Sequence, residues 1–141
     1  MVEFQSLDLL IRFGKEFGHR QIRGNGFNET EFLICSFIMK NPRCSQLDAV
    51  NGLKMDKTTL AKALNVLENK GYVRRVQDTK DRRVNRLQVT EEGAEHMETL
   101  LGLHDQWMKS ILTVLNDKEQ KQMDNYIRRL LEAAENLKTE E

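Results

Sequence analysis

Proline, cysteine and long apolar runs are scarce in this 141-residue chain. Its one proline, Pro42, leaves the rest of the chain free to form uninterrupted helices, because proline breaks a helix interior. Two cysteines, Cys35 and Cys44, form no CxxC pair and imply no disulfide framework. No segment approaches the roughly 20 apolar residues of a membrane span, and the N-terminus has no basic region followed by an apolar run. We therefore expect a cytoplasmic protein without a membrane segment.

Features of enzymes and metal proteins are also missing from the sequence. It contains no glycine-rich phosphate loop, no nucleophile elbow and no clustered acid–base set. Its three histidines are scattered, with no HxxxH spacing that would place two ligands on one helix face. We therefore predict no catalysis, no metal and no cofactor. A redox role is the less favoured interpretation, and it would depend on Cys44. The N-terminus of the following helix and the charge of Arg43 would lower the pKa of this thiol.

Acidic and basic residues balance over the whole chain but not along it. The 22 Lys and Arg match the 22 Asp and Glu, so the net charge is zero. Between Lys54 and Thr90, however, ten basic residues accompany four acidic ones, which gives this segment +6 and the remainder −6. Such a segment attracts a polyanion even in a neutral protein, although a solvated charged face explains the charge equally well.

Hydrophobic spacing and capping signals predict a mainly helical fold. Asn28 and Glu31 are predicted to form a capping box, in which the Asn28 side chain accepts from the Glu31 amide and Glu31 reaches back. Gly52 and Gly71 are expected to end the helices that precede them. Further N-caps are predicted at Ser45, Asp56, Thr90 and Asn116. The predicted helices cover residues 6–22, 29–40, 46–51, 57–70, 94–115 and 117–137.

Residues 72–76 and 84–89 favour two strands joined by a polar turn. A short helix, a tight turn, a second helix and a hairpin form a winged helix-turn-helix, in which the second helix fits the major groove of B-DNA. A basic hairpin tip suits the negative minor groove. The predicted base-reading side chains of the helix are Lys57, Thr58, Thr59, Lys62 and Asn65. The wing candidates are Lys80, Asp81, Arg82 and Arg83, and the phosphate candidates are Ser45, Gln46, Lys54, Arg74, Arg75 and Arg86.

The stretch "SQLDAVNGLKMDKTTLAKALNVLENKGYVRRVQDTKDRRVNRLQVTEEG" resembles the core of the MarR family of transcription regulators. The strongest matches are "LENKGYVRR", the wing signature "DTKDRR" and "LQVTEEG". The resemblance implies a homodimer with intertwined first and last helices, which binds double-stranded DNA at a pseudo-palindromic operator, usually as a repressor. It also implies that Asp81 braces the wing while Arg83, with Arg82 beside it, enters the minor groove. Ala61 departs from the family, whose members often have a threonine there.

The expected organisation is a winged helix-turn-helix over residues 28–90 and a helical dimerisation region over residues 1–27 and 91–141. Apolar stripes in the flanking helices independently favour a dimer over the alternative of a monomeric bundle, because a small winged domain cannot cover them. The resemblance further implies a small lipophilic or phenolic effector, although aromatic residues at helical spacing are more often core. The alternative function is a winged-helix module that binds an acidic protein partner. The candidate effector pocket comprises Phe13, Phe17, Phe32, Phe37 and Trp107.

Overall fold

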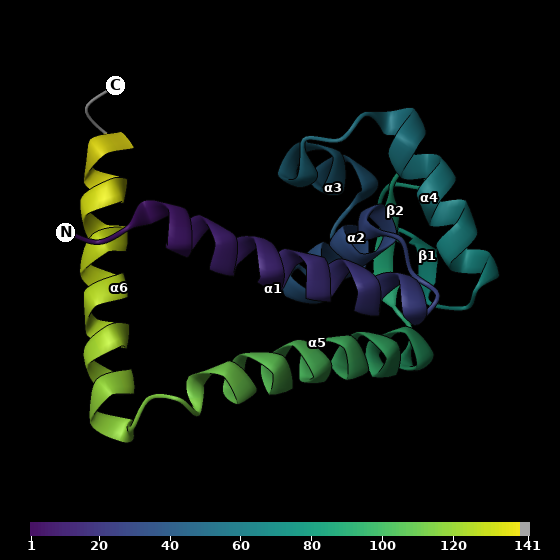
Figure 1. The fold of residues 1–141 in the computed structure, drawn as a ribbon. Coiled ribbons are helices and arrows are strands. Elements are labelled where there is room, and N and C mark those ends of the chain that lie inside the picture. Colours follow the sequence, from purple (N-terminus) through teal and green to yellow (C-terminus); the bar gives the residue numbers. More distant parts are fainter. Residues whose placement is uncertain (139–141) are drawn as a thin grey trace. The chain divides into compact units, whose positions relative to one another are not determined.

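The structure is a computed structural model that describes residues 1–138, and it contains six helices and one two-stranded sheet within them (Figure 1). The mainly helical fold class with a hairpin wing is therefore confirmed. In chain order the elements are α1 (Phe4–Gly24), α2 (Glu29–Lys40), α3 (Gln46–Leu53), α4 (Lys57–Asn69), β1 (Val73–Gln77), β2 (Asn85–Val89), α5 (Glu91–Leu112) and α6 (Asp117–Lys138).

The chain divides into two compact units, Met1–His104 and Asp105–Glu141. The first unit contains the helix-turn-helix and the hairpin, and its core also takes in Ile22 from α1 and Met97 and Leu100 from α5. These three residues lie outside the range predicted for the DNA-binding region. The end of α1 and the start of α5 thus form one folded body with the winged helix, while the functional division at residues 28–90 stays a prediction.

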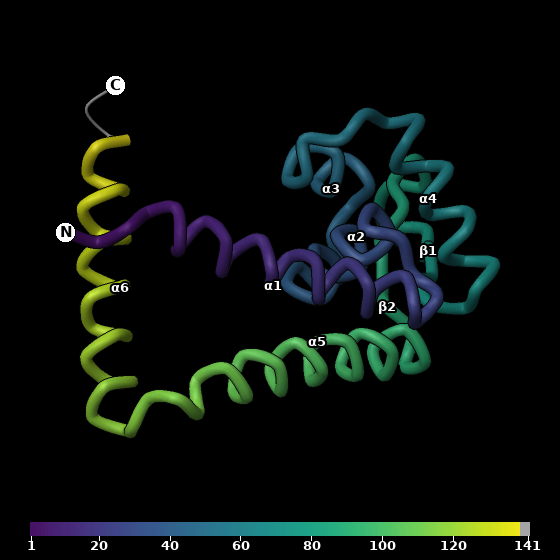
Figure 2. Tube along the Cα trace, in the orientation of Figure 1, coloured from purple at the N-terminus to yellow at the C-terminus, as the bar shows by residue number. Residues whose placement is uncertain are grey.

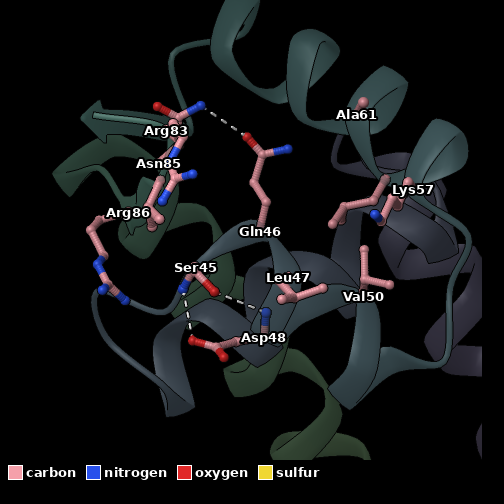
Figure 3. A pocket seen from close by; sticks show the side chains of 12 residues that line it. Ser45, Gln46, Leu47, Asp48, Val50, Lys57, Ala61, Arg83, Asn85 and Arg86 are labelled. Carbon is pink, nitrogen blue, oxygen red and sulfur yellow. Dashed lines mark hydrogen bonds between the residues drawn. The ribbon is translucent and has the colours of Figure 1, made fainter. Parts of the chain in front are cut away.

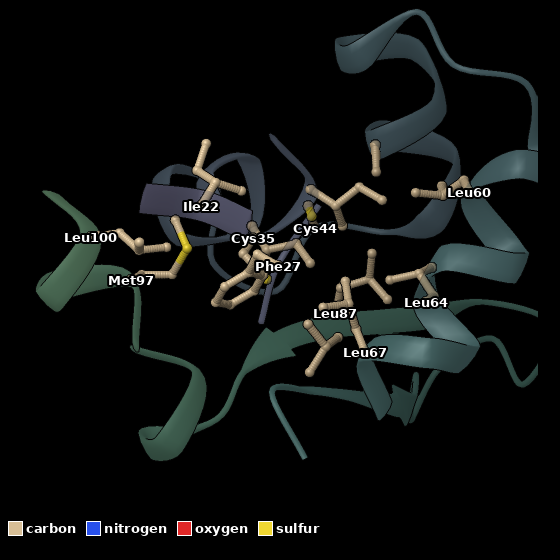
Figure 4. Packing of buried hydrophobic residues seen from close by; sticks show 14 residues of the cluster. Ile22, Phe27, Cys35, Cys44, Leu60, Leu64, Leu67, Leu87, Met97 and Leu100 are labelled. Atoms are coloured by element: carbon tan, nitrogen blue, oxygen red, sulfur yellow. The ribbon is translucent and has the colours of Figure 1, made fainter. Parts of the chain in front are cut away.

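The core of the first unit is built from apolar stripes on α2 and α4 and is closed by β2 (Figure 4). Leu60, Leu64 and Leu67 recur at helical spacing in α4 and are fully buried, as are Ile34 of α2 and Leu87 of β2. Burial of such a side chain contributes about 2 kcal/mol. Because one stripe of α4 is buried in this way, its opposite face is left for solvent or a partner.

The hairpin begins directly after α4 and leads directly into α5, as the chain trace shows (Figure 2). Its strands are antiparallel, with Arg75 opposite Leu87, and each lies within one residue of its predicted ends. The segment before α3 adds an isolated bridge between Ser45 and Arg86, and the Leu87 amide donates to the Cys44 carbonyl at 2.8 Å. The wing is therefore attached to the start of α3 as well as to α4.

Two local predictions at the helix ends are wrong in detail. Gly52 lies inside α3 rather than after it, and the helix is capped by Lys54 in the left-handed conformation (φ 52°). A Cβ added at position 52 would lie 2.3 Å from the ring of Phe37, so a larger residue there would require this ring to move. The helix predicted over 94–115 is also displaced, since α5 begins at Glu91 and ends at Leu112.

The capping box at α2 is only half formed, because the Glu31 side chain has other partners. Asn28 Oδ1 accepts from the Glu31 amide at 2.8 Å, as predicted. The Glu31 carboxylate, however, accepts from the Asn28 side chain at 3.0 Å and from Lys70 Nζ at 2.7 Å. Lys70 also donates to the Gly26 carbonyl at 2.9 Å, so this cluster ties the end of α4 to the start of α2.

The remaining predicted caps are present. Ser45 and Asp48 form a reciprocal capping box at α3, and Asn116 and Glu119 form one at α6.

Across residues 1–138, no helix combines the length and the apolar composition that crossing a bilayer requires.

Candidate nucleic-acid interface

The first turn of α4 is ordered by Asp56, which caps it. The Asp56 carboxylate accepts from the amides of Thr58 at 2.9 Å and Thr59 at 3.3 Å, and also from the Thr59 hydroxyl. These bonds, the hydroxyl of Thr59 first, lower the pKa of Asp56. Lys57, Thr58 and Lys62 are exposed beside this cap. Thr59 is exposed too, but its proton is already donated, so it offers an outside partner its methyl group and acceptor lone pairs.

The tip of the hairpin is held in shape by Asp81. Its carboxylate accepts from the Arg83 amide and from Arg83 Nε, each at 3.0 Å, and from Arg83 Nη2 at 3.1 Å. The Arg83 side-chain bond is the main cause that lowers the pKa of Asp81. The Asp81 amide in turn donates to Asp78 at 3.0 Å, and Gln77 donates to the Arg82 carbonyl at 2.7 Å. The Arg83 side chain nevertheless remains 90% exposed and projects from a braced loop.

A groove of about 690 Å³ lies between the start of α3, the first turns of α4 and the second strand of the hairpin (Figure 3). We call it the interface groove. Residues predicted to contact DNA reach this groove from three elements, with Gln46 in α3, Lys57 in α4 and Arg86 in β2. On one side of the groove, the Asn85 side chain of β2 donates a hydrogen bond to the Gln46 side chain at 3.3 Å. Asn85 had no signal in the sequence beyond its strand position. The full lining is Ser45, Gln46, Leu47, Asp48, Val50, Lys57, Leu60, Ala61, Arg83, Val84, Asn85 and Arg86.

The remaining predicted contact residues differ in how free they are. Lys54, Lys62, Arg74, Lys80 and Arg82 are exposed. Arg86, by contrast, lies 3.6 Å from the Asp78 carboxylate and donates to the Arg43 carbonyl at 3.5 Å. Arg75 and Asn65 are bonded to each other at 2.8 Å. The internal partners of Arg75, Arg86 and Asn65 give these residues a structural role, and their contact with DNA stays a prediction.

A second hollow, of about 240 Å³, lies within the first unit between α1, α2 and α5. Phe17 and Phe32 of the predicted effector set line it. Phe13 is 49% exposed and does not, while Phe37 packs against Gly52. Trp107 belongs to the second unit. The other lining residues are Gly18, Gln21, Ile22, Leu100, Leu101 and His104.

Neither cysteine has the environment of a reactive thiolate. Burial raises the pKa of Cys35 to about 12, with Glu31 adding to the shift. The expectation for Cys44 is wrong in direction, because burial, followed by the Asp48 charge, raises its pKa as well. A backbone hydrogen bond and the nearby Arg86 lower the pKa of Cys44 but do not compensate for the lost hydration of a thiolate. Among residues 1–138, no three His, Cys, Asp or Glu side chains group together as a metal site would need.

Comparison with known sequences relates the interface segment to one family. A sequence model described as "MarR family" matches residues 25–84, which contain α2 to α4 and the hairpin tip. The HTH-type transcriptional regulator BilQ of Clostridioides difficile is 29% identical over 87 residues, which are 62% of this chain and 59% of BilQ. The transcriptional repressor MprA of Escherichia coli is 26% identical over 115 residues, 80% of this chain and 65% of MprA. The chain thus spans less than two thirds of the length of these relatives.

Comparison with solved structures supports the fold over nearly the whole chain. The YusO protein of Bacillus subtilis superposes with a TM-score of 0.84 at 22% identity, covering 92% of each chain. A MepR mutant of Staphylococcus aureus, solved bound to an oligodeoxyribonucleotide, superposes with a TM-score of 0.76 at 18% identity, covering 95% of this chain and 99% of MepR. At these identities the likeness concerns the arrangement of helices and hairpin.

Proposed function

Because the chain belongs to the MarR family of transcription regulators, we propose that it binds double-stranded operator DNA as a homodimer and represses transcription. In this proposal α4 lies in the major groove and the hairpin tip reaches the adjacent minor groove. Lys57, Thr58, Thr59 and Lys62 then meet base edges, and Arg82 and Arg83 enter the minor groove.

One observation carries the proposal: the interface groove joins the exposed first turn of α4 to a basic wing tip. Lys57 and Arg83 line the same hollow although 26 positions separate them in the sequence. The segment from Lys54 to Thr90 supplies a local +6, which phosphates would neutralise. Asp81 contributes by holding Arg83 to the tip before DNA arrives, so less side-chain freedom is lost on binding.

The dimer is supported by apolar side chains that each unit leaves exposed. On α1, Phe4 is 67% exposed and Ile11 48%, and on α6, Leu130 is 68% exposed and Leu131 58%. No residue of α6 is buried in the described chain, although the helix has a strongly apolar face. Exposed apolar surface of this extent marks an interaction site. A two-fold dimer would place two copies of α4 about 34 Å apart, one turn of DNA.

A small lipophilic or phenolic effector is proposed for the 240 Å³ hollow. Its walls are mainly apolar, with Phe17 and Phe32 as aromatic surfaces and Gln21 and His104 as polar groups. A pocket of this composition suits a mostly apolar molecule with one or two polar atoms. Repression is supported by the likeness to MprA, which is named a transcriptional repressor.

The decisive experiment measures affinity for the DNA upstream of the protein's own gene by fluorescence anisotropy across a salt series. Preference over random DNA and a steep fall of affinity with salt are expected. A flat salt response or equal binding to random DNA would overturn the proposal and favour an acidic protein partner. Sedimentation should show a dimer at micromolar concentration.

A matched pair of charge variants locates the interface. Arg82→Gln with Arg83→Gln should weaken operator binding and reduce its salt dependence. Arg128→Gln with Arg129→Gln removes the same charge from α6, outside the proposed DNA interface, and should leave the salt dependence unchanged in protein that sedimentation shows to be dimeric. Equal losses in the two double variants would show that only the overall charge matters.

A further inference from the structure

Arg75 and Arg74 are adjacent in β1 and have the same chemistry, but within the described residues only the Arg75 side chain is bonded to α4. Its Nη2 donates to the Asn65 side chain at 2.8 Å and to the Ala61 carbonyl at 3.2 Å. Its Nε lies 2.7 Å from the Glu68 carboxylate. The Arg74 side chain is exposed and has no hydrogen bond or ion pair within the described chain, while the Arg74 backbone pairs with Gln88 in the hairpin. The two side chains therefore have different tasks.

The three partners of Arg75 lie along one face of α4. Ala61, Asn65 and Glu68 follow one another at spacings of four and three residues, which brings them onto one stripe two turns long. This stripe runs beside the buried stripe of Leu60, Leu64 and Leu67. A single guanidinium thus bridges two turns of the helix, while its backbone pairs in the hairpin opposite Leu87. The rigid planar fork of arginine is what permits several contacts at once.

The charge of Arg75 is already matched inside the protein. Its side chain is only 22% exposed, and Glu68 supplies the opposite charge. The Nε atom is buried, and its contact with Glu68 is an ion pair without the alignment of a hydrogen bond. To reach a phosphate, the guanidinium would have to leave Glu68, Asn65 and the Ala61 carbonyl and leave a carboxylate without its partner.

We infer that Arg75 is a positioning residue, which sets the orientation of α4 relative to the wing instead of contacting phosphate. The inference rests on the proposed function, in which α4 and the wing tip read adjacent grooves together. Operator preference requires the two readers to be held at one relative placement. Neutralising phosphates requires only exposed charge, which Arg74 supplies.

The first test needs no DNA and uses amide hydrogen exchange of the full chain. Arg75→Gln should speed exchange in the second half of α4 by about tenfold, the scale of losing hydrogen bonds to a charged group. Glu68→Gln, which leaves the hairpin sequence intact, should change the same amides in the same direction. Arg74→Gln, with the same loss of charge, should leave them unchanged. Equal exchange in the Arg75→Gln protein and the parent would overturn the inference, whatever the protein binds.

The second test separates positioning from phosphate contact through the salt dependence of operator binding. Losing a phosphate contact should reduce the slope of log affinity against log salt by about 0.9 per subunit. Arg75→Gln should keep the slope of the parent and reduce the ratio of operator to random-DNA affinity by about tenfold. A reduced slope with an unchanged ratio would make Arg75 a phosphate contact and overturn the inference. If the parent shows no operator preference, the proposed function fails, and the exchange experiment still decides the role of Arg75.

Discussion

Gly93, in the first turn of α5, is where the helix lies against the backbone at the start of the hairpin. A Cβ added at this position would lie 2.3 Å from the carbonyl oxygen of Tyr72 and 3.0 Å from its carbonyl carbon. Ordinary contacts between such atoms are about 3.5 Å or longer, so Gly93→Ala forces the two segments apart by about 1 Å. The obstacle is backbone and has no rotamer that would relieve the clash.

The cost of Gly93→Ala follows from what the Tyr72 carbonyl already does. That oxygen accepts from the Thr90 amide at 2.9 Å, so moving it strains the bond that joins the hairpin to the start of α5. Overpacking costs about 1–3 kcal/mol and a weakened hydrogen bond about 1 kcal/mol. The higher helix propensity of alanine offsets up to about 1 kcal/mol. We expect a net loss of about 1–3 kcal/mol in the free energy of unfolding.

Gly102 provides the matched control, because it lies in the same helix with no described atom within 4 Å of its added Cβ. Gly102→Ala should raise the free energy of unfolding by up to about 1 kcal/mol through helix propensity alone. Urea denaturation followed by circular dichroism measures both variants. A Gly93→Ala protein that unfolds at or above the urea midpoint of the parent would refute the close contact.

Three further predictions concern the interface and the thiols. Arg83→Ala should weaken operator binding about tenfold, mostly at sites with A·T-rich flanks, as titration of flank-varied duplexes will test; equal affinities would remove the wing from DNA recognition. Asp56→Ala should lower the unfolding midpoint at neutral pH. The pKa of Asp56 is lower in the folded protein than its ordinary value of 3.8, so the Asp56 carboxylate stabilises the fold above pH 3.8 and loses this effect as the pH falls through the folded-state pKa. The unfolding midpoints of the parent and the Asp56→Ala protein should therefore converge in acid. A difference between them that does not change with pH would contradict this prediction. Cys35 should resist a thiol reagent at pH 8 until the protein unfolds, because a pKa of about 12 leaves about one thiol in ten thousand as thiolate. Labelling of the Cys44→Ser protein with and without urea measures this resistance. Rapid labelling of the native protein would show that the buried site opens to solvent.

The sequence alone determined those features that depend on neighbours three or four residues away. The caps at Asn28, Ser45 and Asp56 were predictable because each bonds an amide two or three residues later. The buried stripe of α4 followed from the spacing of its leucines, and the hairpin from β-branched strands around a polar turn. These local signals are sufficient to predict the helices and the hairpin of the winged helix-turn-helix.

Tertiary structure decided what depends on residues far apart in the chain. Arg74 and Arg75 are indistinguishable in sequence, and only the packing of β1 on α4 gives Arg75 its partners. The pKa of Cys44 rises because folding removes water from the thiol, an effect that outweighs the backbone hydrogen bond and the Arg86 charge, which lower it. Helical spacing and capping are local and appear in the order of the residues, whereas burial and charge pairing across elements exist only once the chain has folded.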